Sequence, residues 1–143
     1  MPYEYLDEIA TADVAFRAAG RDLSELFAAA ADATMNVMVD DLETVRPYRQ
    51  LELRLENERL DMLLFDLLQE LIYYKDAEQL LLRVRAVQID QADGAYRLRG
   101  QAAGERLDPA RHAQGADIKA VTLHQFRVYQ DAGRWFAQVI LDI

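Results

Sequence analysis

The printed sequence closes with two anionic groups side by side, because Asp142 precedes the terminal carboxylate of Ile143. The residues before them, Val139-Ile140-Leu141, are apolar and β-prone, and they predict a buried closing strand in place of a frayed tail. Such a strand would hold both anionic groups in fixed positions. Asp13 is the acid expected to join them, because it opens another apolar strand directly after the small residues Ala10-Thr11-Ala12.

Fixed carboxylates of this kind favour a divalent metal that prefers oxygen ligands, namely calcium or magnesium. The chain has no cysteine and only two histidines, which weighs against zinc and copper sites. A strand-end aspartate also commonly caps a turn, and this alternative applies to both Asp13 and Asp142. No Gly-rich segment is followed by Lys and Ser or Thr, so a phosphate-binding loop for nucleotides is not expected.

The two histidines are expected to have different surroundings. His124 is predicted to lie in a strand, on the same face as Thr122 and Phe126, where a hydrogen-bonded structural histidine is favoured over a functional one. His112 follows Arg111 in a loop, where an exposed imidazole is the default expectation. A nucleophile with an adjacent base is therefore poorly supported.

The overall charge weighs against direct, tight binding to nucleic acid. The net charge is -9, from 25 acidic and 16 basic residues, whereas phosphate backbones need clustered Lys and Arg. The most closely spaced basic residues are Arg83 with Arg85 and Arg97 with Arg99. Each pair is two positions apart in a predicted strand, the spacing expected of residues on its solvent-facing side. The acidity instead suits a cation or a basic protein partner.

Length and composition predict one compact domain. The chain has 143 residues, of which 52% are hydrophobic, enough for a single core. No apolar run is long enough to span a membrane, and the N-terminal residues lack the pattern of a signal peptide. The absence of cysteine fits a reducing compartment, so we expect a cytoplasmic protein.

Hydrophobic periodicity predicts the elements that must position these residues. Helices are expected at 23–37 and 61–75, the first opened by a capping box of Asp22 and Glu25. Strands are expected at 3–6, 13–18, 48–56, 84–89, 95–100, 121–129 and 134–143. Because the strands come in hairpins, the predicted fold class is α+β, a mostly antiparallel sheet of six to seven strands packed with two long helices. The segment 104–117 is the longest candidate functional loop.

Several segments together resemble the archease family, over essentially the whole chain and in order. These are Thr11-Ala12-Asp13-Val14 ahead of Phe16, the helix from Leu23 to Met38, Gly104-Glu105 with Asp108-Pro109 and Arg111-His112, Lys119 to His124, and Val139 to Ile143. One position departs from the family pattern. Many members carry a histidine directly before Thr-Ala-Asp, whereas this chain has Ala10.

The resemblance implies a protein cofactor and not an enzyme. Archeases activate the RtcB-type RNA ligase of tRNA splicing by promoting guanylylation of the ligase and its multiple turnover, and some members broaden its nucleotide specificity. By position, Asp13 and Asp142 match the family's metal-binding aspartates, Ile143 matches the residue that supplies a further oxygen, and calcium is the metal assigned there. Lys119 and His124 are the residues expected to act on the partner. The Lys119 ammonium is expected near the acids, either contacting phosphate or paired with an aspartate.

Two other functions remain open from the residues alone. A metal-dependent hydrolase would use Asp13 and Asp142 to hold a cation that activates water, with His124 or His112 as base. A general chaperone or assembly module would expose the apolar second helix as a binding patch.

Overall fold

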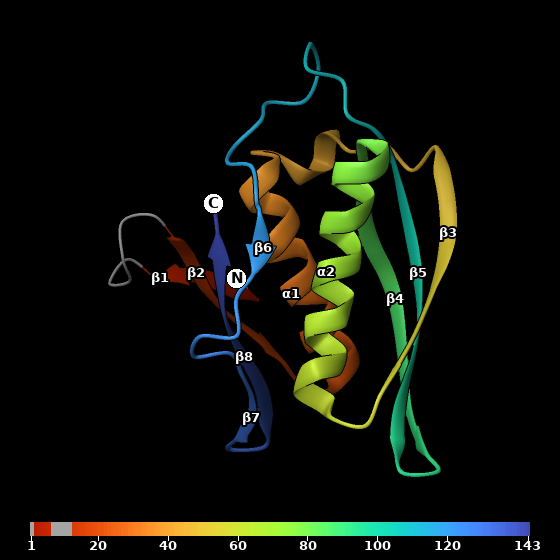
Figure 1. Cartoon of the computed structure of the whole chain (residues 1–143), viewed down its shortest axis with the longest axis vertical. Helices are drawn as coiled ribbons and strands as arrows, with labels where there is room; N and C mark the ends of the chain where they lie inside the picture. The colour runs from red at the N-terminus through yellow and green to blue at the C-terminus, as the bar shows by residue number, and fades with distance from the viewer. Residues whose placement is uncertain (1, 7–12) are drawn as a thin grey trace.

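The computed structural model describes residues 2–6 and 13–143, and it arranges them as two antiparallel sheets with two helices between them (Figure 1). One sheet contains β1 (Tyr3–Leu6), β2 (Asp13–Gly20), β6 (Ala120–Val121), β7 (Arg127–Asp131) and β8 (Arg134–Asp142). The other contains β3 (Arg49–Asn57), β4 (Leu80–Ala92) and β5 (Ala95–Arg106). The helices are α1 (Leu23–Met38) and α2 (Leu60–Glu78), with the short 3-10 helix η1 (Leu42–Thr44) after α1.

The predicted α+β class and antiparallel pairing are confirmed, but the division into two sheets was not predicted. The strand order is β1-β2-β8-β6 with β7 beside β8 in one sheet, and β3-β5-β4 in the other. In the described part of the chain this makes eight strands, against the six or seven expected. Both helices contact both sheets, because their apolar surfaces are too broad for one sheet to cover.

The first helix begins with the predicted cap in an altered form. The Asp22 carboxylate accepts a hydrogen bond from the Glu25 main-chain N–H at 2.9 Å. The Glu25 carboxylate, however, accepts from the Arg21 N–H at 3.1 Å, one residue earlier than a capping box requires. The chain is therefore fixed on both sides of the helix start.

The second helix contributes much of a core that both sheets share. Its buried apolar residues are Leu63, Leu64, Leu67, Leu68, Leu71 and Ile72. Within the residues that the structure describes, this helix therefore lacks the broad exposed apolar patch that the chaperone interpretation expected on it. Neither described helix has the length and apolarity needed to cross a bilayer.

Two strands of the second sheet, β4 and β5, run further than their predicted bounds, whereas β3 keeps its predicted length. The first three residues of β4, Leu80–Leu82, are all buried, so they lack the polar alternation that marks a half-exposed strand. Asp93 and Gly94 both have positive φ angles and form the predicted two-residue hairpin turn. The prediction that Arg83 faces solvent is wrong, because its side chain is mostly buried and forms an ion pair with Asp32 at 3.1 Å.

Close contact between β4 and β5 gives a stability prediction. A Cβ atom added at Gly104 would overlap the Leu81 carbonyl, whereas one added at Gly100 in the same strand would lie 3.5 Å from its nearest neighbour. Gly104→Ala should lower the free energy of unfolding by about 1 to 3 kcal/mol, the usual scale of overpacking. Gly100→Ala is the matched control and should change it little. Denaturant unfolding of both variants tests this, and equal effects would contradict the close approach.

Candidate functional site

Asp13 and Asp142 lie directly opposite each other in the antiparallel pair of β2 and β8. Directly opposed residues point to the same side of a sheet, so the two carboxylates share one face. The next pair, Val14 with Leu141, points to the other side, where Leu141 is fully buried in the core. The register is therefore held by core packing, since a slip of one residue would expose Leu141.

Within the described residues, the opposed aspartates have no neutralising partner. Among the described residues, neither carboxylate forms an ion pair with a Lys, Arg or His side chain. Like charges directly opposite each other on neighbouring strands are destabilising, and a bound cation would relieve the repulsion. The donor chemistry of the pair fits a hard cation.

Two side chains are a small ligand set, however. The described ranges contain no group of three or more His, Cys, Asp and Glu side chains that could hold a metal ion. A cation at Asp13 and Asp142 would need main-chain oxygens and water as further ligands, which calcium accepts readily. Ile143 follows Asp142 and is the nearest source of such an oxygen along the chain. Ala10, where the family pattern has histidine, lies outside the described residues.

Lys119 reaches Asp142 through its main chain. The Lys119 N–H donates to the Asp142 carbonyl oxygen at 2.8 Å, and Ala120 then pairs with Asp142 as β6 begins. Asp142 is thus held between β2 on one side and the start of β6 on the other. The Lys119 side chain is exposed and, in the part of the chain described, forms no ion pair with an aspartate. The ammonium is therefore available to a partner.

The segment before Lys119 is fixed to the ends of both helices. The N–H groups of Gly115 and Ala116 donate to the carbonyl oxygens of Met38 and Val37, each at 2.9 Å. These bonds satisfy carbonyls that a helix end otherwise leaves to solvent. From α2, the Lys75 ammonium pairs with Asp117 and also contacts the Ile118 carbonyl at 3.4 Å.

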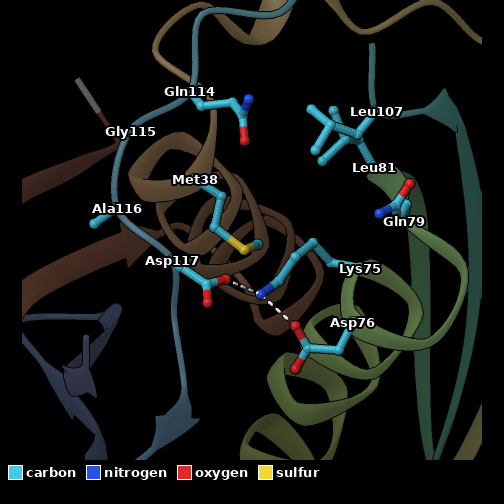
Figure 2. A pocket seen from close by; sticks show the side chains of 10 residues that line it. All are labelled: Met38, Lys75, Asp76, Gln79, Leu81, Leu107, Gln114, Gly115, Ala116 and Asp117. Atoms are coloured by element: carbon cyan, nitrogen blue, oxygen red, sulfur yellow. Dashed lines mark hydrogen bonds and ion pairs between the residues drawn. The ribbon is translucent and has the colours of Figure 1, made fainter. Parts of the chain in front are cut away.

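Figure 2 shows the cavity beside this anchor, with Lys75 bridging Asp76 of its own helix and Asp117 of the loop. The cavity has a volume of about 270 Å³, and its lining residues are Met38, Lys75, Asp76, Gln79, Leu81, Leu107, Gln114, Gly115, Ala116 and Asp117. Burial alone would lower the pKa of Lys75, but the hydrogen bonds to Asp117 and Asp76 outweigh it and raise that pKa. The lysine therefore stays charged and joins the loop to the helix.

Sequence reasoning missed Lys75. The residue lies four positions after Leu71 and seven after Leu68, on the apolar stripe of its helix. A charged residue on a buried stripe needs a partner, and that periodicity could have singled it out.

A second buried cluster anchors the other end of the loop. The Glu105 carboxylate accepts hydrogen bonds from the Arg111 guanidinium, from the Arg46 N–H at 2.6 Å and from His112 Nε2 at 3.1 Å. His112 Nδ1 accepts from the Asp108 N–H at 2.9 Å, so the neutral ring carries its proton on Nε2. Burial would raise the pKa of Glu105, but these hydrogen bonds outweigh it and hold the pKa at about 2.

Both histidine predictions are therefore wrong. His112 is 1% exposed, because the loop folds back over Glu105, and its ring is fully engaged. His124 is exposed in a turn, because the predicted strand at 121–129 divides into β6 and β7 around residues 122–126. Gln125 in that turn has a φ of 53°, which a continuous strand excludes. His112 cannot serve as the free base of a hydrolase.

Comparisons with known proteins agree over nearly the whole chain. The model of the archease protein family matches residues 3–143. The archease of Pyrococcus furiosus is 38% identical over 134 residues, covering 93% of this chain and 94% of the relative. The solution structure of Methanobacterium thermoautotrophicum protein 1598 has 34% identity and a TM-score of 0.86, covering 99% of both chains. A Thermotoga maritima structure titled an archease and possible chaperone matches with a TM-score of 0.60, covering 94% of this chain and 93% of its own. At 17% identity it bears on the fold alone.

The Glu105 cluster predicts a pH-dependent stability. Because the pKa of Glu105 falls from its ordinary 4.5 to about 2 on folding, its contribution is complete above about pH 4.5 and is lost as the pH falls toward 2. Glu105→Gln should reduce the free energy of unfolding at pH 7 by about 1 to 3 kcal/mol. The difference from the wild type should shrink on acidification. Denaturant unfolding at several pH values tests this, with the exposed Glu58→Gln as control. A difference that does not change with pH would contradict the assignment.

Proposed function

The chain belongs to the archease family, and on this basis we propose that it activates an RtcB-type RNA ligase of tRNA splicing. In this proposal the protein is a cofactor without turnover of its own. It promotes guanylylation of the ligase and repeated turnover. The observation that carries the proposal is the opposed pair of Asp13 and Asp142 at one end of the paired strands β2 and β8.

The acidic pair would act as a metal-binding tip. Asp13, Asp142 and a main-chain oxygen of Ile143 would hold a divalent cation, with calcium as the proposed ion. When bound, the ion supplies positive charge that can organise phosphate oxygens or further carboxylates. The protein's own part is to keep the oxygen ligands in place, which the core-held register of β2 and β8 supports.

Lys119 would contribute a second charge of opposite sign. Its main chain is fixed to Asp142, while its exposed ammonium pairs with none of the acids in the described residues. A phosphate or carboxylate of the ligase is a suitable partner for such a point charge. The net charge of -9 would steer the tip toward a basic surface.

His124 has less support as a residue that acts on the ligase. It lies in the exposed turn between β6 and β7 and not on the strand where the sequence analysis expected it. In the proposal, His124 contacts the ligase only at the periphery of the interface.

The direct test is a guanylylation assay of the ligase with and without this protein, with calcium, magnesium or a chelator present. Asp142→Ala should reduce the stimulation at least about tenfold, because mutating residues that support a metal site commonly lowers metal affinity or activity by that factor or more. Asp90→Ala removes the same charge from an exposed position of β4 and should leave stimulation unchanged.

Three results would contradict the proposal. Asp142→Ala could stimulate as the wild type does, Asp90→Ala could lose as much activity as Asp142→Ala, or the wild-type protein could fail to stimulate its cognate ligase. Thermal unfolding of both variants, measured in parallel, separates loss of the site from loss of the fold.

A further inference from the structure

The outer face of the β1-β2-β8-β7 sheet carries a row of aromatic and basic side chains. In Figure 1 both helices lie on one side of this sheet. Along β8, Trp135, Ala137 and Val139 belong to the core or pack against it. Side chains alternate along a strand, so Arg134, Phe136 and Gln138 project from the opposite face.

Four of these residues form an arginine-aromatic ladder, namely Arg127, Tyr129, Phe136 and Arg134. Tyr129 and Phe136 are cross-strand partners whose rings stack with centroids 5.4 Å apart and planes 19° apart. The guanidinium of Arg127 lies 4.6 Å from the Tyr129 ring centroid, and that of Arg134 lies 5.9 Å from the Phe136 centroid. Both rings are partly exposed and lie outside the core cluster.

The ladder's arginines have no carboxylate within ion-pair distance in the described ranges. Both arginines are exposed, and each guanidinium lies over an aromatic ring. Asp131 is the cross-strand partner of Arg134 but does not form an ion pair with it in the described residues. A cation held in position by an aromatic ring and not neutralised by a carboxylate is suited to bind an anionic ligand.

The neighbouring row contains a buried hydrogen-bond donor for which the described part of the chain offers no acceptor. Gln138 pairs across the sheet with Arg17 on one side and with Arg127 on the other, so the three share one row of the same face. One Arg17 nitrogen lies 3.4 Å from Glu4, but Arg17 Nε is buried and has no hydrogen-bond partner among residues 2–6 and 13–143. A buried N–H without an acceptor is costly, and an acceptor oxygen from a ligand would satisfy it.

We propose that this face binds single-stranded nucleic acid. Bases would stack against the exposed parts of the ladder, and phosphate oxygens would accept hydrogen bonds from Arg127, Arg134 and Arg17. A partner protein that offered only carboxylates would use the arginines and leave the stacked rings without a role. The inference goes beyond the proposed action on a ligase. It also departs from the expectation that this acidic protein does not bind nucleic acid directly, because the ladder places basic side chains together on one face.

The position of the ladder relates it to the acidic pair. Phe136 and Asp142 are six residues apart on β8 and project from the same face, a separation of about 20 Å along the strand. A single strand held on the ladder would therefore lie on the same side of the sheet as Asp13 and Asp142.

Fluorescence anisotropy with a labelled single-stranded RNA of about ten nucleotides tests the inference without any ligase present. The wild type should bind saturably at low salt, and the affinity should fall as salt rises. The double variant R127Q/R134Q should bind at least about tenfold more weakly. Its matched control is R97Q/R99Q, which removes the same charge from exposed positions of the other sheet and should bind within about twofold of the wild type.

Tyr129→Leu separates stacking from charge, because it keeps apolar bulk while removing the ring. Stacked bases contribute about 1 to 3 kcal/mol each, so this variant should lose at least about fivefold in affinity. Thermal unfolding of every variant shows whether the fold is retained. The Arg→Gln pair, on exposed side chains, tests the site even if the leucine variant fails to fold.

Four results would overturn the inference. In the anisotropy assay they are the absence of saturable binding at low salt, equal losses of affinity in the two arginine double variants, and binding of duplex RNA as tight as that of the single strand. The fourth is that the ladder variants weaken association with the ligase while their RNA binding stays unchanged. The last result would assign the face to a protein partner. The first three results come from an assay without ligase and the fourth from a separate measurement of ligase binding, so none of them depends on whether guanylylation is stimulated.

Discussion

The antiparallel pairing of β2 with β8 is the constraint on which both proposed sites depend. Its apolar side chains, among them Phe16 and Val139, are buried against the helices, so the register cannot slip without exposing them. The same register places Asp13 opposite Asp142 at one end of the outward face and places Arg17 opposite Gln138 on that face. A packing requirement on one side of the sheet thus arranges charged groups on the other.

The loop that joins the two sheets depends on a different kind of interaction. It crosses the helix ends between β5 and β6, and two buried or nearly buried charged groups hold it there (Figure 1). Glu105 fastens its first part through Arg111 and His112, and Lys75 fastens its last part through Asp117. Because each charge has hydrogen-bonding partners, its burial is tolerated. The result is a fixed path for the chain into Lys119 and β6.

Local periodicity predicted the elements whose residues alternate or repeat regularly. The strand of Asp13, the closing strand and both helices follow from the sequence, and the hairpin turn at Asp93-Gly94 follows from its residue types. The burial of Glu105 and His112 could not be predicted in this way, because a loop folding back on a strand leaves no periodic pattern. The turn at His124 was missed for a similar reason, since its flanking residues resemble one continuous strand.

The central claim is that the opposed carboxylates bind a divalent cation, and its location can be measured directly. Manganese in place of calcium broadens NMR signals near the bound ion, so a titration of the isotope-labelled protein reports where it binds. The account predicts the strongest broadening at the amides of Asp13, Ala120, Asp142 and Ile143, and its removal by excess calcium. Broadening centred on another acidic region, or none in this group, would contradict it.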